Sequence, residues 1–102
     1  MTRIGDDTVS RFAHGCRSAI GTSAAPLTTQ AYHAARGVQL RAAATNTAAV
    51  YVGRSDVTAG GSDATCGYPL EANEGLFLPL SDPRQIHLIA ASAGQSIYWL
   101  VL

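Results

Sequence analysis

The sequence contains 102 residues, enough for one small domain with a hydrophobic core of limited size. Seven arginines balance seven carboxylates and there is no lysine, so the formal net charge of zero gives no basic surface for nucleic acid. No apolar run approaches the roughly 20 residues of a transmembrane helix, and Asp6 and Asp7 stand where a secretory signal would be apolar. We therefore expect a protein made in the cytoplasm, with neither a nucleic-acid nor a membrane partner.

Charged residues make up 14% of the chain, against a usual value of about 25%. A surface with so few charges favours contact with other molecules over exposure to water. The two cysteines, Cys16 and Cys66, are too few and too far apart for the disulfide framework of a secreted domain. We expect reduced thiols that pack as small apolar groups, although a bridge between them stays possible.

Residues 1–26 show neither the helical nor the strand period clearly. Apolar residues at helical spacing in 11–20 are interrupted by Gly15, and turn-forming residues follow at 21–26. Sequence of this kind is typical of an extended arm. We predict an N-terminal arm over residues 1–26 and a single β-domain over residues 27–102.

Three extended segments begin the predicted β-domain. Residues 27–33 are rich in β-forming types, and residues 37–43 alternate apolar with polar side chains. Residues 50–53 place two valines on one face and Tyr51 on the other. A connection rich in glycine, serine and aspartate follows at 54–65, and a loop of that length in a compact domain is more often functional than accidental.

The second half of the domain contains two predicted hairpins. Residues 68–70 form a short edge strand, and a turn in which Asn73 or Gly75 takes a positive φ should join it to residues 76–80. Residues 85–91 and 96–102 should pair through a tight turn centred on Gly94 and Gln95.

The last strand is apolar on both faces. Ile97, Trp99 and Val101 share one face, whereas the other carries Tyr98, Leu100 and Leu102. A strand of a solvated antiparallel sheet should instead alternate with polar residues. The second face must therefore be covered by the N-terminal segment, by a closed barrel wall or by another subunit.

These patterns predict an all-β fold. We expect about six to eight antiparallel strands in a small sandwich or flattened barrel with jelly-roll-like connections, preceded by the extended N-terminal arm. The order of the strands is not fixed by the sequence.

Metal and catalytic sites are not indicated. The five possible nitrogen and sulfur ligands lack the paired spacing of a structural zinc site, so we expect neither a metal nor another cofactor; they are His14, Cys16, His33, Cys66 and His87. Ser55 and Ser62 lie outside any nucleophile motif, and Gly60-Gly61 lacks the lysine of a phosphate-binding loop. The carboxylates outside the arm lie in predicted turns, so we do not expect an enzyme.

The aromatic residues have two interpretations. Rings within strands are more often core or interface anchors than stacking platforms. The alternative is a carbohydrate-binding module that uses Tyr51, Tyr68 or Trp99.

Six segments together resemble a small β-domain that is common in the virion proteins of tailed phages and prophages. They are N-T-A-A-V-Y-V-G-R-S-D-V-T at 46–58, G-Y-P-L-E-A-N-E at 67–74, L-F-L-P-L at 76–80, D-P at 82–83, I-H-L-I-A-A at 86–91 and A-G-Q-S-I-Y-W-L at 93–100. The resemblance covers residues 38–102. Residues 72–74 read Ala-Asn-Glu where the family tends to have Pro-Gly-Glu, a change within turn chemistry.

The resemblance implies a virion structural role, first of all that of a capsid decoration (cement) protein on the head surface whose partner is the major capsid protein. The same module occurs in tail, baseplate and fibre proteins, which are the alternative location. A protein of this kind should self-associate, with a trimer as the expected oligomer.

The predicted contact residues follow from the two unexplained apolar features. The apolar last strand suggests an oligomer interface through Tyr98, Trp99 and Leu100. The arm would reach the capsid through apolar anchors and arginines, namely Arg3, Arg11, Phe12, Arg17 and Ile20. On this reasoning, deleting residues 1–23 should leave the fold and the oligomer intact while weakening attachment.

Overall fold

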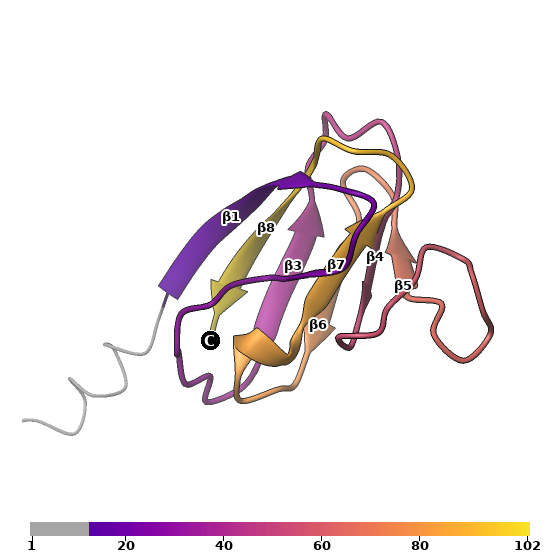
Figure 1. The fold of residues 1–102 in the computed structure, drawn as a ribbon. Coiled ribbons are helices and arrows are strands. Elements are labelled where there is room, and N and C mark those ends of the chain that lie inside the picture. The colour runs from indigo at the N-terminus through magenta and orange to yellow at the C-terminus, as the bar shows by residue number, and fades with distance from the viewer. Residues whose placement is uncertain (1–12) are drawn as a thin grey trace, which may run out of the picture.

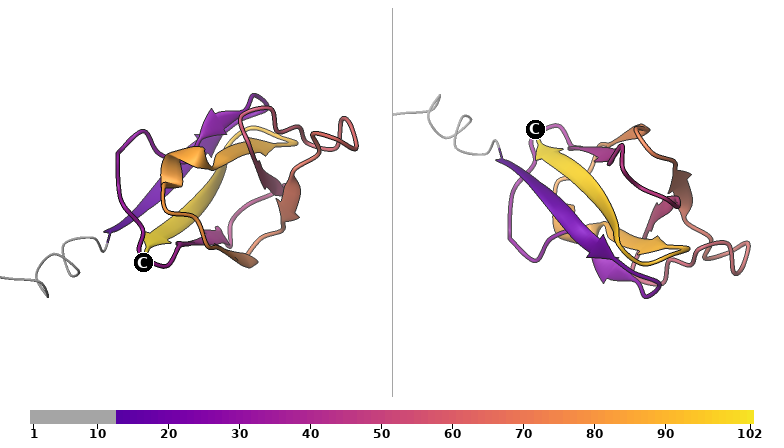
Figure 2. Two further views of the ribbon diagram at one scale, coloured as in Figure 1. Left: turned by 90° about the horizontal axis from the view of Figure 1, so that it is seen from below. Right: turned by 90° about the horizontal axis from the view of Figure 1, so that it is seen from above.

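The computed structural model describes residues 13–102, which form two four-stranded antiparallel sheets packed face to face (Figures 1 and 2). Sheet A contains, in spatial order, β1 (Ala13–Ile20), β8 (Gln95–Val101), β3 (Val38–Ala42) and β6 (Gly75–Leu78). Sheet B contains β2 (Ala25–Pro26), β7 (His87–Ala90), β4 (Val50–Gly53) and β5 (Tyr68–Leu70). One short 3₁₀ helix, η1 (Pro83–Gln85), precedes β7.

The strand pairing is that of a jelly roll. Strands β1, β2, β3 and β4 pair in turn with β8, β7, β6 and β5, so the first half of the domain runs alongside the second half in reverse order. This long ribbon is then folded over, which adds the pairs β3 with β8 and β4 with β7. The predicted all-β sandwich with jelly-roll-like connections is confirmed.

The core lies between the sheets and follows the alternation that the sequence shows. In β3 and β4 every second residue is buried, and in β8 the buried positions include Ile97, Trp99 and Val101. Tyr32, in the connection from β2 to β3, packs its ring against Trp99 at a centroid distance of 5.6 Å. The largest side chain of the core is therefore held by sheet A and by a loop that is not a strand.

Both predicted hairpins are wrong in their pairing. β5 and β6 lie in different sheets, as do β7 and β8, so each predicted hairpin turn is a connection that crosses between layers. Asn73 does take a positive φ, of 71°. Gln95, predicted to lie within a turn, is instead the first residue of β8 and is buried, while Gly94 takes the positive φ of 89°.

The predicted boundary between arm and domain needs correction. β1 forms a complete ladder with β8, and β2 pairs with β7, so residues 13–26 belong to the sandwich. The glycine and turn-forming residues that suggested an arm accommodate a close approach of the Trp99 ring at Gly15 and the connection between the sheets. Residues 27–33, predicted as a strand, form irregular structure after Leu27, whose N–H donates to the carbonyl of Ile86. Residues 1–12 lie outside the described part of the chain.

A buried side-chain amide closes one end of the sandwich. Gln95 is 1% exposed, and its Oε1 accepts hydrogen bonds from the backbone N–H groups of Thr47 and Ala48 at 2.8 and 3.2 Å. Its Nε2 donates to Thr47 Oγ1 and to the carbonyls of Ser92 and Ala93. One side chain thus ties the connection from β3 to β4 to the connection from β7 to β8.

Replacing this amide with an apolar group of similar size should destabilise the domain. Gln95→Leu leaves buried backbone donors without partners, and each such group costs about 1–3 kcal/mol, so we expect a loss of at least about 2 kcal/mol in chemical denaturation. The exposed Gln30 supplies a control, because Gln30→Leu should change stability by less than about 0.5 kcal/mol. Equal stability of both variants would contradict the role assigned to Gln95.

The position of β1 reverses the expected result of the N-terminal deletion. Removing residues 1–23 takes away β1, including the core residue Ile20, and leaves the inner side of β8 open beside Trp99. The truncated chain should lose its cooperative thermal transition in circular dichroism. A truncated chain that melts cooperatively, at the temperature of the full chain, would show that β1 is dispensable.

Candidate interaction surface on sheet A

The outer face of sheet A gathers most of the exposed large apolar side chains of the described residues. Four of the five such residues lie on it or at its end: Phe77, Tyr98, Leu100 and Leu102, which are 37–52% exposed. The fifth, Tyr68, lies in β5 at the edge of sheet B. Clustering of this kind on one face marks an interaction site more often than scattered exposure does.

The cross-strand register brings these side chains together. Tyr98 of β8 lies between Cys16 of β1 and Arg41 of β3. In the next row, Leu100 lies between His14 and Gln39, and Gln39 is followed by Phe77 of β6. Neighbours in such rows are about 4.5–5.5 Å apart at Cβ, so the apolar groups form one patch across all four strands.

The patch is hollowed. A depression of about 550 Å³ opens between the side chains of Tyr98 and Leu100 and those of β3, and it extends over Gly75, which has no side chain to fill it. His14 and Arg41 supply polar groups to its lining. The Arg41 guanidinium donates to Asn73 Oδ1 at 3.0 Å, which holds it beside the depression.

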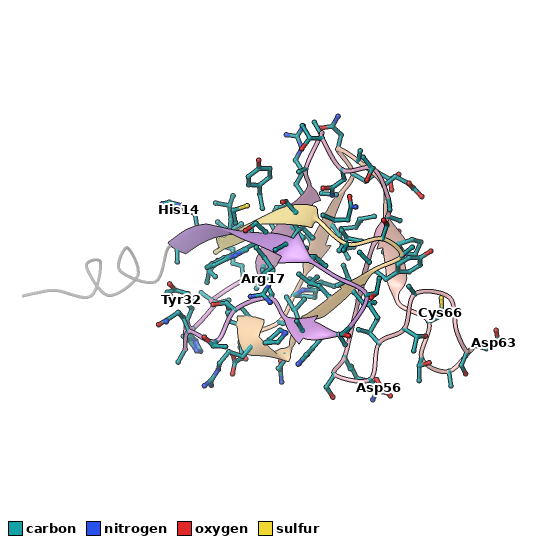
Figure 3. The ribbon with its side chains drawn as sticks, turned by 45° about the horizontal axis from the view of Figure 1, so that its top comes forward. His14, Arg17, Tyr32, Asp56, Asp63 and Cys66 are labelled. Atoms are coloured by element: carbon teal, nitrogen blue, oxygen red, sulfur yellow. The ribbon has the colours of Figure 1, made fainter. Side chains whose placement is uncertain are left out.

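The carboxylates of the described residues lie away from this face. Asp56 and Asp63 belong to the connection from β4 to β5, which Figure 3 shows on the opposite side of the domain from His14. Glu71 and Glu74 lie in the connection from β5 to β6. Asp82 caps η1, where hydrogen bonds from the side chain and N–H of Arg84 lower the pKa of its carboxyl. The face itself therefore combines apolar groups with the positive charge of Arg41.

The structure separates the three residues that we predicted for the oligomer interface. Tyr98 and Leu100 point outward, at 52% and 37% exposure, and lie at the centre of the patch. Trp99 points inward and is 7% exposed, so its assignment to an interface is wrong. The predicted division of the last strand into two apolar faces had already placed Trp99 opposite its neighbours.

The predicted capsid-contact residues also divide. Ile20 is 3% exposed and belongs to the core, so it is not available as a surface anchor. Arg17 is half-buried in β1 opposite Ile97, on a strand of the sandwich and not on an arm. Arg3, Arg11 and Phe12 lie outside the described residues.

Sequence reasoning missed Phe77 as a surface residue. The signal was present, because Leu76, Leu78 and Leu80 were expected to share a face and Phe77 must then take the other. Both cysteines are free in the structure, and both are exposed, which corrects the expectation that they pack as small apolar groups. Cys16 contributes to the sheet A face, whereas Cys66 belongs to the loop after β4.

The remaining chemical candidates are dispersed. Within residues 13–102 no three histidine, cysteine, aspartate or glutamate side chains come together in a way that would hold a metal ion. In the same residues no helix has the length and apolarity needed to cross a membrane. The aromatic residues of the carbohydrate alternative do not share a platform, since Trp99 is buried and Tyr51 and Tyr68 occupy alternate positions across the β4–β5 pair.

The long connection from β4 to β5 has defined structure of its own. Thr58 and Cys66 form an isolated parallel bridge, and the hydroxyls of Thr58 and Thr65 lie 3.0 Å apart. Val57 is 4% exposed and fills the space beside Gly53 and Gly67, neither of which has a side chain. The loop therefore packs against the domain at its base and projects beyond it (Figure 1).

Comparisons with protein-family models, with curated proteins and with solved structures found no match to this chain.

The support beneath the surface patch can be tested at Gly15. A Cβ added at this position would lie 2.4 Å from Cζ2 of Trp99, so the indole ring must move. Because overpacking of a core typically costs about 1–3 kcal/mol, Gly15→Ala should lower the unfolding free energy by that amount and alter the Trp99 fluorescence. Gly21→Ala is the control, since nothing lies within 4 Å of its added Cβ. Unchanged stability and fluorescence in Gly15→Ala would contradict the packing described.

Proposed function

We propose that the chain is a structural protein of a phage virion, a capsid decoration protein that self-associates on the head surface and holds neighbouring major capsid subunits together. The observation that carries the proposal is the apolar outer face of sheet A, presented by a jelly roll. The resemblance of residues 38–102 to a virion β-domain supports the same role.

The geometry suits a contact function. The face is built on four paired strands, so its side chains are held by a rigid scaffold and binding orders few new groups. Tyr98 and Phe77 are aromatic, a type enriched at interfaces, because a large apolar area is held by few rotatable bonds. Apolar burial contributes about 25 cal/mol per Å², so a patch of this kind supplies useful attachment energy even when each contact is modest.

Self-association strengthens such attachment. Linked copies bind at one symmetry axis as a unit, so weak contacts of each copy combine into tight binding. The trimer expected from the resemblance would act in this way. Arg41 is suited to pair with a carboxylate on the capsid side of the contact, because its guanidinium lies at the margin of the patch.

The proposal is tested by binding of the purified protein to expanded heads of the phage that encodes it. We expect the double variant Tyr98→Ser, Leu100→Ser to bind at least about tenfold more weakly, because it removes the centre of the patch. Both side chains are exposed, so circular dichroism should show an unchanged fold.

Tyr68→Ser is the matched control, since Tyr68 is more exposed than either residue and lies in sheet B. Full binding by the double variant, or equal loss in the control, would contradict the assignment of the face. Localisation of the protein on the tail instead of the head would replace the decoration role with that of a tail, baseplate or fibre component.

A further inference from the structure

The four edge strands of the sandwich differ in how they are protected. β1 has a bulge, with a register shift between Arg17 and Ile20, and β2 contains only Ala25 and Pro26. β5 carries Pro69 in its centre. These are the devices by which proteins keep sheet edges from pairing with other chains. β6 reads Gly-Leu-Phe-Leu and has no proline, charge or bulge.

The free edge of β6 carries a defined set of hydrogen-bonding groups. The N–H of Ala42 donates to the carbonyl of Glu74, and Arg41 lies opposite Gly75. Because antiparallel pairs alternate between bonded and non-bonded, Leu76 and Leu78 turn their backbone groups toward β3. Gly75 and Phe77 therefore turn theirs away from it, and β6 pairs with no other strand within residues 13–102.

We propose that β6 pairs with β6 of a second copy of this chain, as an antiparallel two-fold contact centred on Leu76. In this register Gly75 of each copy lies opposite Phe77 of the other, and all eight outward backbone groups are used in four hydrogen bonds. A pairing centred on Phe77 would set Gly75 against Pro79, which has no N–H. A pairing centred on Gly75 would set Phe77 against Asn73, whose positive φ of 71° ends the strand.

The side chains are self-complementary in the same register. On the outer face, the Phe77 ring of one copy lies over Gly75 of the other, where no side chain obstructs it. On the inner face, the two Leu76 side chains meet. Leu76 and Leu78 already line an apolar hollow of about 490 Å³ between the β5 and β6 edges, and the partner copy would cover its mouth. Sheet A becomes one continuous sheet of eight strands.

This contact is independent of the proposed function. It joins copies in pairs through an edge, so the outer faces of both sheets A stay free and lie side by side. A trimer held through another surface would be joined into an assembly of even copy number.

Disulfide trapping tests the register. In a chain with Cys16→Ser and Cys66→Ser, Leu76→Cys should form a covalent dimer under mild oxidation, because non-bonded pairs have Cα atoms about 4.5 Å apart and a disulfide accepts this spacing. Leu78→Cys is the matched control: it is also half-buried in β6, but the two copies of that residue would be about 14 Å apart. Absence of a dimer in Leu76→Cys, or equal dimer in both variants, overturns the proposal.

A second pair of variants separates backbone pairing from side-chain contact. Phe77→Pro removes an N–H that faces away from β3, so the monomer should keep its β-spectrum while light scattering shows loss of the pair. Phe77→Ala keeps the N–H and should retain pairing with reduced affinity. A wild-type protein that stays monomeric, or a proline variant that pairs at least as tightly as the alanine variant, would contradict strand pairing at β6.

Discussion

The domain depends on the pairing of β8 along both of its edges. β8 lies between β1 and β3, so the last strand of the chain holds together strands from the beginning and the middle of the domain. Its inward residues, Ile97, Trp99 and Val101, supply part of the core, while Tyr98 and Leu100 supply the centre of the outer patch. The same alternation therefore stabilises the fold and creates the surface for which we propose a function. A register slip of one residue would exchange the two sets.

Two polar side chains fix that register at the end where β8 begins. Gln95 binds the connection from β3 to β4 and the connection from β7 to β8. Asn46 exchanges two hydrogen bonds of 2.8 Å with the backbone of Ser96. Buried apolar contacts alone are weakly directional, whereas these amides accept one alignment of the strands. They thus give specificity to a core made largely of interchangeable aliphatic side chains.

Local patterns predicted the strands much better than their partners. The alternation in residues 37–43, 50–53 and 96–102 identified β3, β4 and β8, because the face of each side chain is set within the strand itself. The pairing of β7 with β8 was wrong because a short glycine-containing connection fits a hairpin and a crossing between sheets equally well. β1 was missed since Gly15 makes room for Trp99, 84 positions further along the chain, a contact that no local window contains. Of the surface patch, the sequence indicated Tyr98 and Leu100, while Phe77 joins them only through the register of β3.

The central claim is that the outer face of sheet A is covered when the protein is assembled on its target. Hydroxyl-radical footprinting of the free and the assembled protein measures this at single side chains. Tyr98 and Tyr68 are similarly exposed in the free domain, at 52% and 60%, so each serves as the reference for the other. The account predicts that assembly protects Tyr98 strongly and leaves Tyr68 as reactive as before. Protection of Tyr68 with Tyr98 unchanged would contradict it.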